Sequence, residues 1–271
     1  MPPFWFVLTS FLALLVLFLS WRLVSSRTWK QLQLRKAAKL AAAGRTAEML
    51  DYLHRNMNRK DVSDPITNAL VYFYIKSGRY EEAESLISTA IEKGDDSAMA
   101  LAQLGYVAGG RKDHAAAEEY YRRALAMDES LRPTMNMNIA GMLIETGQRL
   151  DEAEELLKDT LELREGTARS GVHTNLAMLY LKRKQPVEAR VQAMTAYELL
   201  PSGSAILNGS RASALALASR ACSMQGEPDE AARLAGKALK LVQDIPGMER
   251  MAEELRHMAS SGPPEGPEGE N

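Results

Sequence analysis

Apolar residues recur along this chain with a helical period, and short turns divide the pattern into segments of similar length. Within each segment, large apolar residues follow the i, i+3, i+4, i+7 spacing that gives a helix one apolar face. Glycine marks several of the turns, at Gly44, Gly78, Gly147 and Gly226. No segment alternates apolar and polar residues as a β-strand does. The pattern therefore predicts an all-α chain built from paired helices.

A small residue marks the same place in four successive helix pairs. Ala83, Ala117, Ala153 and Ala189 follow one another at steps of 34, 34 and 36 residues. A period near 34 with a small residue at the helix crossing is typical of stacked helix-turn-helix repeats. Because one pair cannot bury both of its faces, neighbouring pairs must stack and share a core.

These repeats resemble the tetratricopeptide-repeat family. The clearest copy consists of Leu101, Leu104, Gly105, Ala117, Tyr121 and Ala124. The resemblance implies an α-α superhelical solenoid of about five to six helix pairs, following an N-terminal transmembrane helix. We expect repeats at residues 64–94, 97–130, 133–164 and 170–201, and a repeat-like pair at 211–243. A basic segment with a degenerate first repeat (22–60), a capping helix (247–259) and a disordered tail (260–271) complete the predicted layout.

The N-terminal region contains an apolar run, residues 4–21, without a single charge. As a helix this run is about 27 Å long, close to the hydrocarbon thickness of about 30 Å. Trp5 and Trp21 stand at its two ends, where aromatic rings favour the membrane interface. The alternative is a cleaved signal peptide, but no basic residue precedes the run and no small-residue cleavage site follows it. We therefore expect a retained transmembrane anchor.

Charge is distributed unevenly along the chain. Residues 1–47 carry a formal charge of +7 and the rest carries −9, because the first acidic residue is Glu48. Positive charge beside an apolar span stays on the cytoplasmic side. We therefore predict a single-pass protein of a bacterial inner membrane with a cytoplasmic C-terminal domain; the bacterial setting rests on the resemblance in layout. The residues expected at the membrane interface are Trp5, Trp21, Arg22, Arg27 and Lys30.

Two points about this basic region stay open. The charges either act only as a topology signal, which is the simpler interpretation, or also rest on anionic lipid head groups. Residues 22–43 either continue the membrane helix into the repeats or break at Ser25–Ser26.

The side chains that carry chemistry are scattered. The four histidines lack a recurring metal-ligand spacing, Cys222 is the only cysteine, and no phosphate-binding loop is present. Acidic pairs such as Glu118–Glu119 and Glu154–Glu155 are predicted to form solvated faces at helix starts. We expect no catalytic residue, no metal, no cofactor and no enzymatic activity. The mildly acidic repeats also argue against a nucleic-acid partner.

The resemblance places partner-binding residues on the first helix of each pair. They are Asn68, Tyr72, Ile75, Ala102, Tyr106, Met137, Asn138, Thr174, Met178, Leu181 and Arg220. This set is rich in Met and Tyr and lacks the cluster of Lys, Arg and Asn with which some family members clamp an acidic C-terminus. We therefore predict a protein or peptide partner that offers an apolar or amphipathic segment.

The predicted function is that of a membrane-anchored scaffold or adaptor that holds partner proteins on the cytoplasmic side. The alternatives are a protein-import receptor, and an envelope or cytochrome-assembly receptor in which the repeats capture peptides. The sequence does not predict the oligomeric state.

Overall fold

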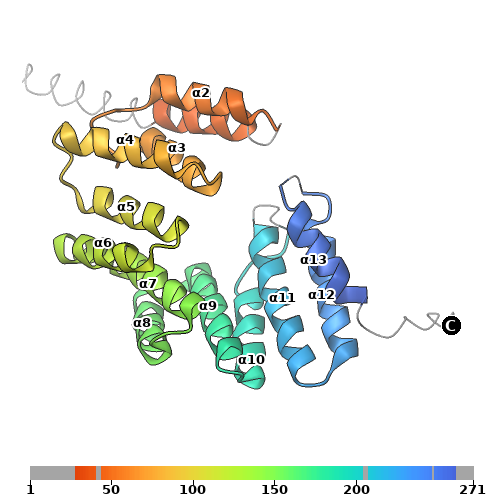
Figure 1. Cartoon of the computed structure of the whole chain (residues 1–271). Helices are drawn as coiled ribbons and strands as arrows, with labels where there is room; N and C mark the ends of the chain where they lie inside the picture. Colours follow the sequence, from red (N-terminus) through yellow and green to blue (C-terminus); the bar gives the residue numbers. More distant parts are fainter. Residues whose placement is uncertain (1–27, 41–43, 204–206, 246, 261–271) are drawn as a thin grey trace, which may run out of the picture. The chain divides into compact units, whose positions relative to one another are not determined.

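The computed structural model describes residues 28–40, 44–203, 207–245 and 247–260. Every regular element in these ranges is helical, and helix follows helix along the chain (Figure 1). The predicted all-α fold is thus confirmed for the part of the chain that is described. The chain divides into two compact units, which end and begin at Asp113 and His114.

The described residues of unit 1 form a helix over residues 28–40 and four further helices. These are α2 (Thr46–Asn56), α3 (Pro65–Lys76), α4 (Tyr80–Glu92) and α5 (Ala98–Gly110). Along the chain from α2 to α5, each helix packs against the next. Leu53, Leu70 and Ile87 are fully buried between them. The start of α3 is fixed as the sequence suggests: the Asp64 carboxylate accepts hydrogen bonds from the Ile66 and Thr67 amides.

Unit 2 contains eight α-helices among its described residues. They are α6 (His114–Met127), α7 (Arg132–Thr146), α8 (Leu150–Leu163), α9 (Arg169–Lys182), α10 (Pro186–Glu198), α11 (Asn208–Met224), α12 (Pro228–Val242) and α13 (Glu249–Ser260). Short 3-10 turns at Glu129–Leu131 and Gly166–Ala168 precede α7 and α9. Each helix packs against the next, and α9 also contacts α7 and α11. The first helices of successive pairs therefore stack side by side.

The alanines that mark the repeats are all buried. Ala83, Ala117, Ala153 and Ala189 all have an exposed fraction of 0%. Interiors are packed about as densely as organic crystals, so a larger side chain at these positions has no free volume to enter. Within each unit, Ala83, Ala153 and Ala189 thus help to set how closely α4 approaches α3, α8 approaches α7 and α10 approaches α9.

Charged side chains connect three of the turns within helix pairs to the preceding pair. An arginine of the turn donates to a glutamate one residue after the repeat alanine of that pair. The pairs are Arg111 with Glu84, Arg149 with Glu118 and Arg183 with Glu154, at 2.7, 2.6 and 2.5 Å. The expectation of a solvated acidic face is therefore wrong for Glu118 and Glu154, whose side chains are only 20% and 17% exposed.

Several turns require a left-handed backbone, and most of them use glycine. Gly78 has φ 72° and Gly226 has φ 78°. At the equivalent turns after α5 and α9 the left-handed residues are Lys112 (φ 62°) and Lys184 (φ 58°). A side chain with a Cβ is disfavoured in this conformation, so these two turns carry a local cost that the glycine turns avoid.

The predicted transmembrane run at 4–21 lies outside the described residues, as do Trp5, Trp21, Arg22 and Arg27. Within the described ranges, no helix combines the length and the apolar character needed to cross a bilayer. The predicted tail at 261–271 is likewise outside the description, whereas Ser260 belongs to α13 and not to the tail.

Candidate functional site

In unit 1, the predicted partner-binding residues of α3 form a partly exposed face. Tyr72 is 53% exposed, with its ring edge-on to Phe73 and the Lys76 ammonium 5.7 Å from its centroid. Asn68 and Ile75 are half-buried, and the Asn68 amide points at the Met99 sulfur, 4.0 Å away. This helix therefore offers an aromatic ring and polar side chains on one exposed face.

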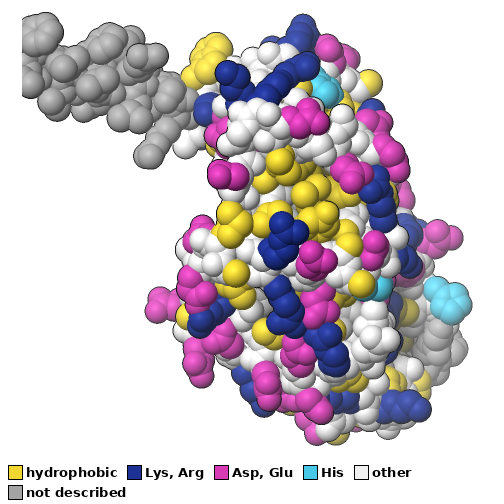
Figure 2. Space-filling model, turned by 60° about the vertical axis from the view of Figure 1, so that its left-hand side comes forward, with side chains coloured by type: hydrophobic (Ala, Val, Ile, Leu, Met, Phe, Trp, Pro, Cys, Tyr) yellow, Lys and Arg dark blue, Asp and Glu magenta, His cyan; other side chains and the backbone are white. Residues whose placement is uncertain are grey.

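The two predicted residues of α5 differ in exposure. Tyr106 is half-buried, so that part of its side chain reaches the surface. Ala102 is only 1% exposed and belongs to the interior of unit 1. Ala102 cannot contact a partner in this arrangement, because the small residues of the repeat serve helix packing here. Figure 2 shows the kind of surface that results, with hydrophobic side chains exposed between acidic and basic ones.

In unit 2, the structure brings three of the predicted residues together. Thr174 and Met178 of α9 and Arg220 of α11 line a cavity of about 260 Å³. Met251, Leu255 and Met258 of α13 form much of the remaining wall. Met137, Asn138 and Leu181 are half-buried but do not line this cavity. The stacked first helices and α13 thus share one apolar, methionine-rich face.

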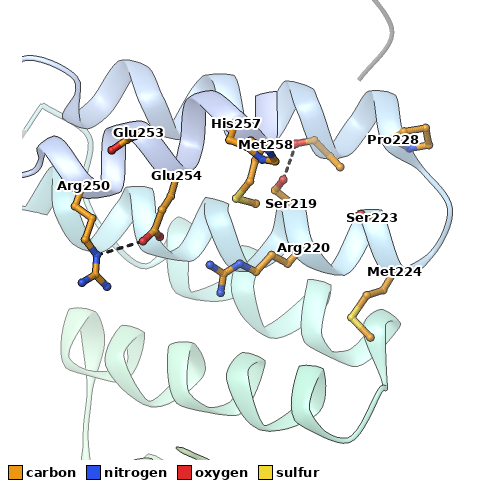
Figure 3. Close-up of a pocket in the computed structure, with 11 residues that line it drawn as sticks. Ser219, Arg220, Ser223, Met224, Pro228, Arg250, Glu253, Glu254, His257 and Met258 are labelled. Atoms are coloured by element: carbon orange, nitrogen blue, oxygen red, sulfur yellow. Dashed lines mark hydrogen bonds and ion pairs between the residues drawn. The ribbon is translucent and has the colours of Figure 1, made fainter. Parts of the chain in front are cut away.

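A larger cavity, of about 1030 Å³, opens beside the first one (Figure 3). It lies between the C-terminal half of α11, the start of α12 and α13. Figure 3 shows Arg220 and Met224 of α11 lining one side of this cavity, and Glu254 and Met258 of α13 lining the other. The hydroxyl of Ser219 donates to the Ala231 carbonyl at 2.7 Å. This hydrogen bond joins α11 to α12, and both residues line the larger cavity.

Charge in this larger cavity is mixed. The Arg250 guanidinium donates to Glu254 at 3.3 Å, so these two charges offset one another. Arg220 is exposed, and no carboxylate of the described residues lies within ion-pair distance of it. The cavity therefore combines methionine walls with the guanidinium of Arg220 and the exposed carboxylate of Glu253. Methionine side chains adapt to varied apolar surfaces.

Helix α13 also belongs to this site, although the sequence predicted it mainly as a capping helix. Met251, Leu255 and Met258 of this helix, with Met248 just before it, follow the helical spacing, and this pattern predicted an amphipathic helix. The structure shows that one side of this helix buries Leu255, to 1% exposure, against α11 and α12. The same helix lines both cavities, and Leu255 itself belongs to the wall of the smaller one. The sequence signal for this second role was the length of the apolar stripe.

Two titratable residues that could suggest chemistry, His54 and Cys222, are partnered or buried. The His54 ring bonds the Tyr74 hydroxyl, and burial, followed by the charges of Arg59 and Arg79, lowers the pKa of His54. Burial raises the pKa of the Cys222 thiol, which disfavours the reactive thiolate. Within the described ranges, no group of three or more His, Cys, Asp or Glu side chains is arranged to hold a metal ion.

The stacked helix pairs and the exposed faces of their first helices define a helical-repeat protein. Residues 99–131 match the family model of the tetratricopeptide repeat. The chain therefore contains a tetratricopeptide repeat, and its further helix pairs follow the same architecture.

One curated relative is the type IV pilus assembly protein PilF of Pseudomonas aeruginosa, which is 32% identical over 117 residues. The match covers 43% of this chain, and the chain spans only 46% of that relative. A solved structure of Pseudomonas aeruginosa PilF superimposes with a TM-score of 0.51 and 25% identity, covering 71% of this chain and 85% of that one.

Other solved structures share the fold alone. The Cut9–Hcn1 structure of the APC/C matches with a TM-score of 0.64 at 15% identity, over 84% of this chain and 42% of that chain. Yeast Tom70 matches with a TM-score of 0.58 at 16% identity, over 80% and 43% of the two chains.

Proposed function

We propose that the chain is a membrane-anchored scaffold that binds an apolar or amphipathic segment of a partner protein. The observation that carries the proposal is the methionine-lined face of α9, α11 and α13, with its two cavities and the available guanidinium of Arg220. Helix-in-groove recognition uses apolar anchors on one helix face, and methionine walls accept such anchors. An acidic residue next to the anchors would pair with Arg220.

The exposed parts of unit 1 add a second contact surface to this proposal. Tyr72 presents an aromatic ring, a residue type that is enriched where proteins meet. Tyr106 contributes the exposed part of its side chain.

Site-specific crosslinking in intact membranes tests the partner site. A photoreactive residue at Ser213, on the wall of the smaller cavity, should capture a partner segment. Met178→Lys and Arg220→Glu should each reduce that capture at least about tenfold, because one inserts a charge among apolar walls and the other reverses the cation. Val191→Lys is the matched control, since Val191 is 56% exposed on α10 and lines neither cavity. Equal capture by all three variants would remove the proposed site.

The proposed location is a bacterial inner membrane, with residues 4–21 as the anchor and the repeats in the cytoplasm. The uncharged run and the +7 charge of residues 1–47 support it. Protease digestion of sealed vesicles tests it: the repeats should be cut in inside-out vesicles and protected in right-side-out ones. The reverse pattern would favour the alternative of an envelope or cytochrome-assembly receptor, and a mitochondrial origin would favour an import receptor.

Type IV pilus assembly is the second candidate, because the relative with 32% identity is a pilus assembly protein. Deletion of the gene from a host that makes type IV pili should then reduce the pili sheared from the cell surface. Complementation with the intact gene should restore them, and complementation with the Met178→Lys variant should not. Normal pili in the deletion strain would refute this candidate without affecting the scaffold proposal.

A further inference from the structure

The helix over residues 28–40 has one side held against unit 1. The Lys30 ammonium forms an ion pair with Asp64, whose side chain is only 2% exposed. The Gln33 amide donates to Asn56 at 2.9 Å, and Ala37 is 1% exposed. Because these three residues lie on one side of the helix, the rotation of the helix about its axis is fixed.

This packing also alters the expectation for Lys30. The sequence places it among the residues at the membrane interface, but its charge is directed at the N-terminus of α3. The residues that face outward are instead Trp29, Leu32, Arg35, Lys36 and Lys39, all of them exposed.

The outward residues combine two chemistries on one face. Trp29 is 62% exposed and Leu32 is 55% exposed, which is a large apolar area for two neighbouring turns of a helix. At about 100° per residue, Leu32 and Lys39 lie almost in line, and Arg35 and Lys36 flank them. Figure 2 shows basic and hydrophobic side chains together at the upper end of the view.

The charge on this face is of one sign. No acidic residue precedes Glu48 in the sequence, so no carboxylate of the same helix offsets Arg35, Lys36 or Lys39. Lys36 lies over the Tyr52 ring at 4.6 Å, and no carboxylate of the described residues pairs with Arg35 or Lys39. A helix face with Trp and Leu beside basic residues is suited to the boundary between lipid head groups and acyl chains. Anionic lipids supply the opposite charge.

We propose that Trp29, Leu32, Arg35, Lys36 and Lys39 form a face that lies on a bilayer containing anionic lipid. The inference rests on the proposed membrane location, but not on the identity of the protein partner. Trp29 and Leu32 enter the interface, while Arg35 and Lys39 contact head-group phosphates. The face decides how unit 1 is oriented on the membrane, which a span at 4–21 alone does not.

Tryptophan fluorescence of the full chain tests this contact. In a Trp5→Phe/Trp21→Phe background Trp29 is the only tryptophan, since the chain has three. The protein is reconstituted into nanodiscs of phosphatidylcholine, with or without phosphatidylglycerol, and with acyl chains brominated near the head group. Trp29 emission should be quenched and blue-shifted in the anionic discs, and much less so in the zwitterionic ones.

Charge variants separate the proposed face from general electrostatic attraction. Replacing Arg35, Lys36 and Lys39 together by Gln should weaken docking of the face on the order of 100-fold, at about fivefold for each charge near the surface. The matched control replaces Lys93, Lys240 and Arg256 by Gln, because these are exposed cations elsewhere in the chain. The control should keep the quenching of Trp29.

Each outcome is informative. The chain could enter the discs while the intensity and wavelength of Trp29 emission stay the same with brominated lipid and with either lipid charge. In that case the inference is wrong and the anchor proposal stands. If the chain fails to associate with either kind of disc, both proposals fail. If Trp29 is shielded only when a second copy is crosslinked at this face, the face is a protein contact and the lipid inference is overturned.

Discussion

Arg183 donates a hydrogen bond to Glu154 at 2.5 Å and thereby joins the turn after α9 to the start of α8. Arg111 with Glu84 and Arg149 with Glu118 repeat this relationship. Between α10 and the start of α12 the signs are exchanged, since Arg190 stands one residue after the repeat alanine and donates to Glu227 at 2.7 Å. The contact is thus a property of the stacking register and not of one particular sequence.

The first prediction concerns this ion pair. Arg183→Glu should lower the free energy of unfolding of unit 2 by about 2 kcal/mol, because it places two carboxylates together at a partly buried position. The exchange Arg183→Glu/Glu154→Arg should recover at least about half of that loss, as the Arg190–Glu227 pair already has this polarity. Urea unfolding followed by circular dichroism measures both values. A double variant no more stable than the single one would contradict the register argument.

The second prediction concerns pH. Hydrogen bonds from Lys158, then Arg183 and Tyr180, lower the pKa of Glu154 from 4.5 to about 2. A carboxyl with a lowered folded-state pKa contributes stability above its unfolded pKa, and that contribution is lost as pH falls from about 4.5 towards 2. After discounting for solvent screening, we expect about 1–2 kcal/mol from this residue. The unfolding free energy of Glu154→Gln should therefore fall less steeply than wild type over this pH range.

The third prediction concerns the left-handed turns. Lys184→Gly should raise the unfolding free energy by about 0.5–1 kcal/mol, because glycine avoids the Cβ clash that Lys184 meets at φ 58°. Gly226→Ala should lower the unfolding free energy by about 1 kcal/mol, because Gly226 has φ 78°. Thermal unfolding of the two variants beside wild type provides the measurement, and Lys240→Gly, in the helical last turn of α12, should be destabilising. A loss of stability in Lys184→Gly would refute the strain at this turn.

The fourth prediction concerns the end of α5. A Cβ on Gly110 would lie 2.9 Å from Cζ of Tyr80, well inside contact distance. Gly110→Ala should therefore destabilise unit 1 by about 1–3 kcal/mol through overpacking. In a Tyr80→Leu background the same change should cost much less, since the ring is gone. Equal costs in both backgrounds, measured by urea unfolding, would show that Tyr80 is not the obstacle.

The helix pairs and their small residues were predictable from sequence because they depend on local periodicity. Ala83 and its three equivalents had to be small wherever the helices crossed, and all four are buried. The start of α3 at Asp64–Pro65 was predictable for the same reason, because an N-cap and a first-turn proline act within a few residues.

Features that depend on register between pairs were not predictable in this way. Glu154 looked like an exposed residue at a helix start, because its partner Arg183 is 29 residues away. Ala102 looked like a groove residue, but the rotation of α5 turns it inward. The cavity beside Arg220 depends on how α13 packs against α11 and α12. Sequence periodicity predicts which residues form the apolar stripe of α13, but it does not predict the angle at which the helix packs.

The contact between Lys30 and Asp64 has a mechanical consequence. It fastens the helix over residues 28–40 to the first turn of α3, so that a load applied at the N-terminal side reaches the repeats through an ion pair and a packed seam. A scaffold attached in this manner is held rigidly and does not swing on a flexible tether. On the proposed membrane, a partner bound to unit 1 would then stay at a fixed height above the lipid and would lose little conformational entropy of a tether on binding.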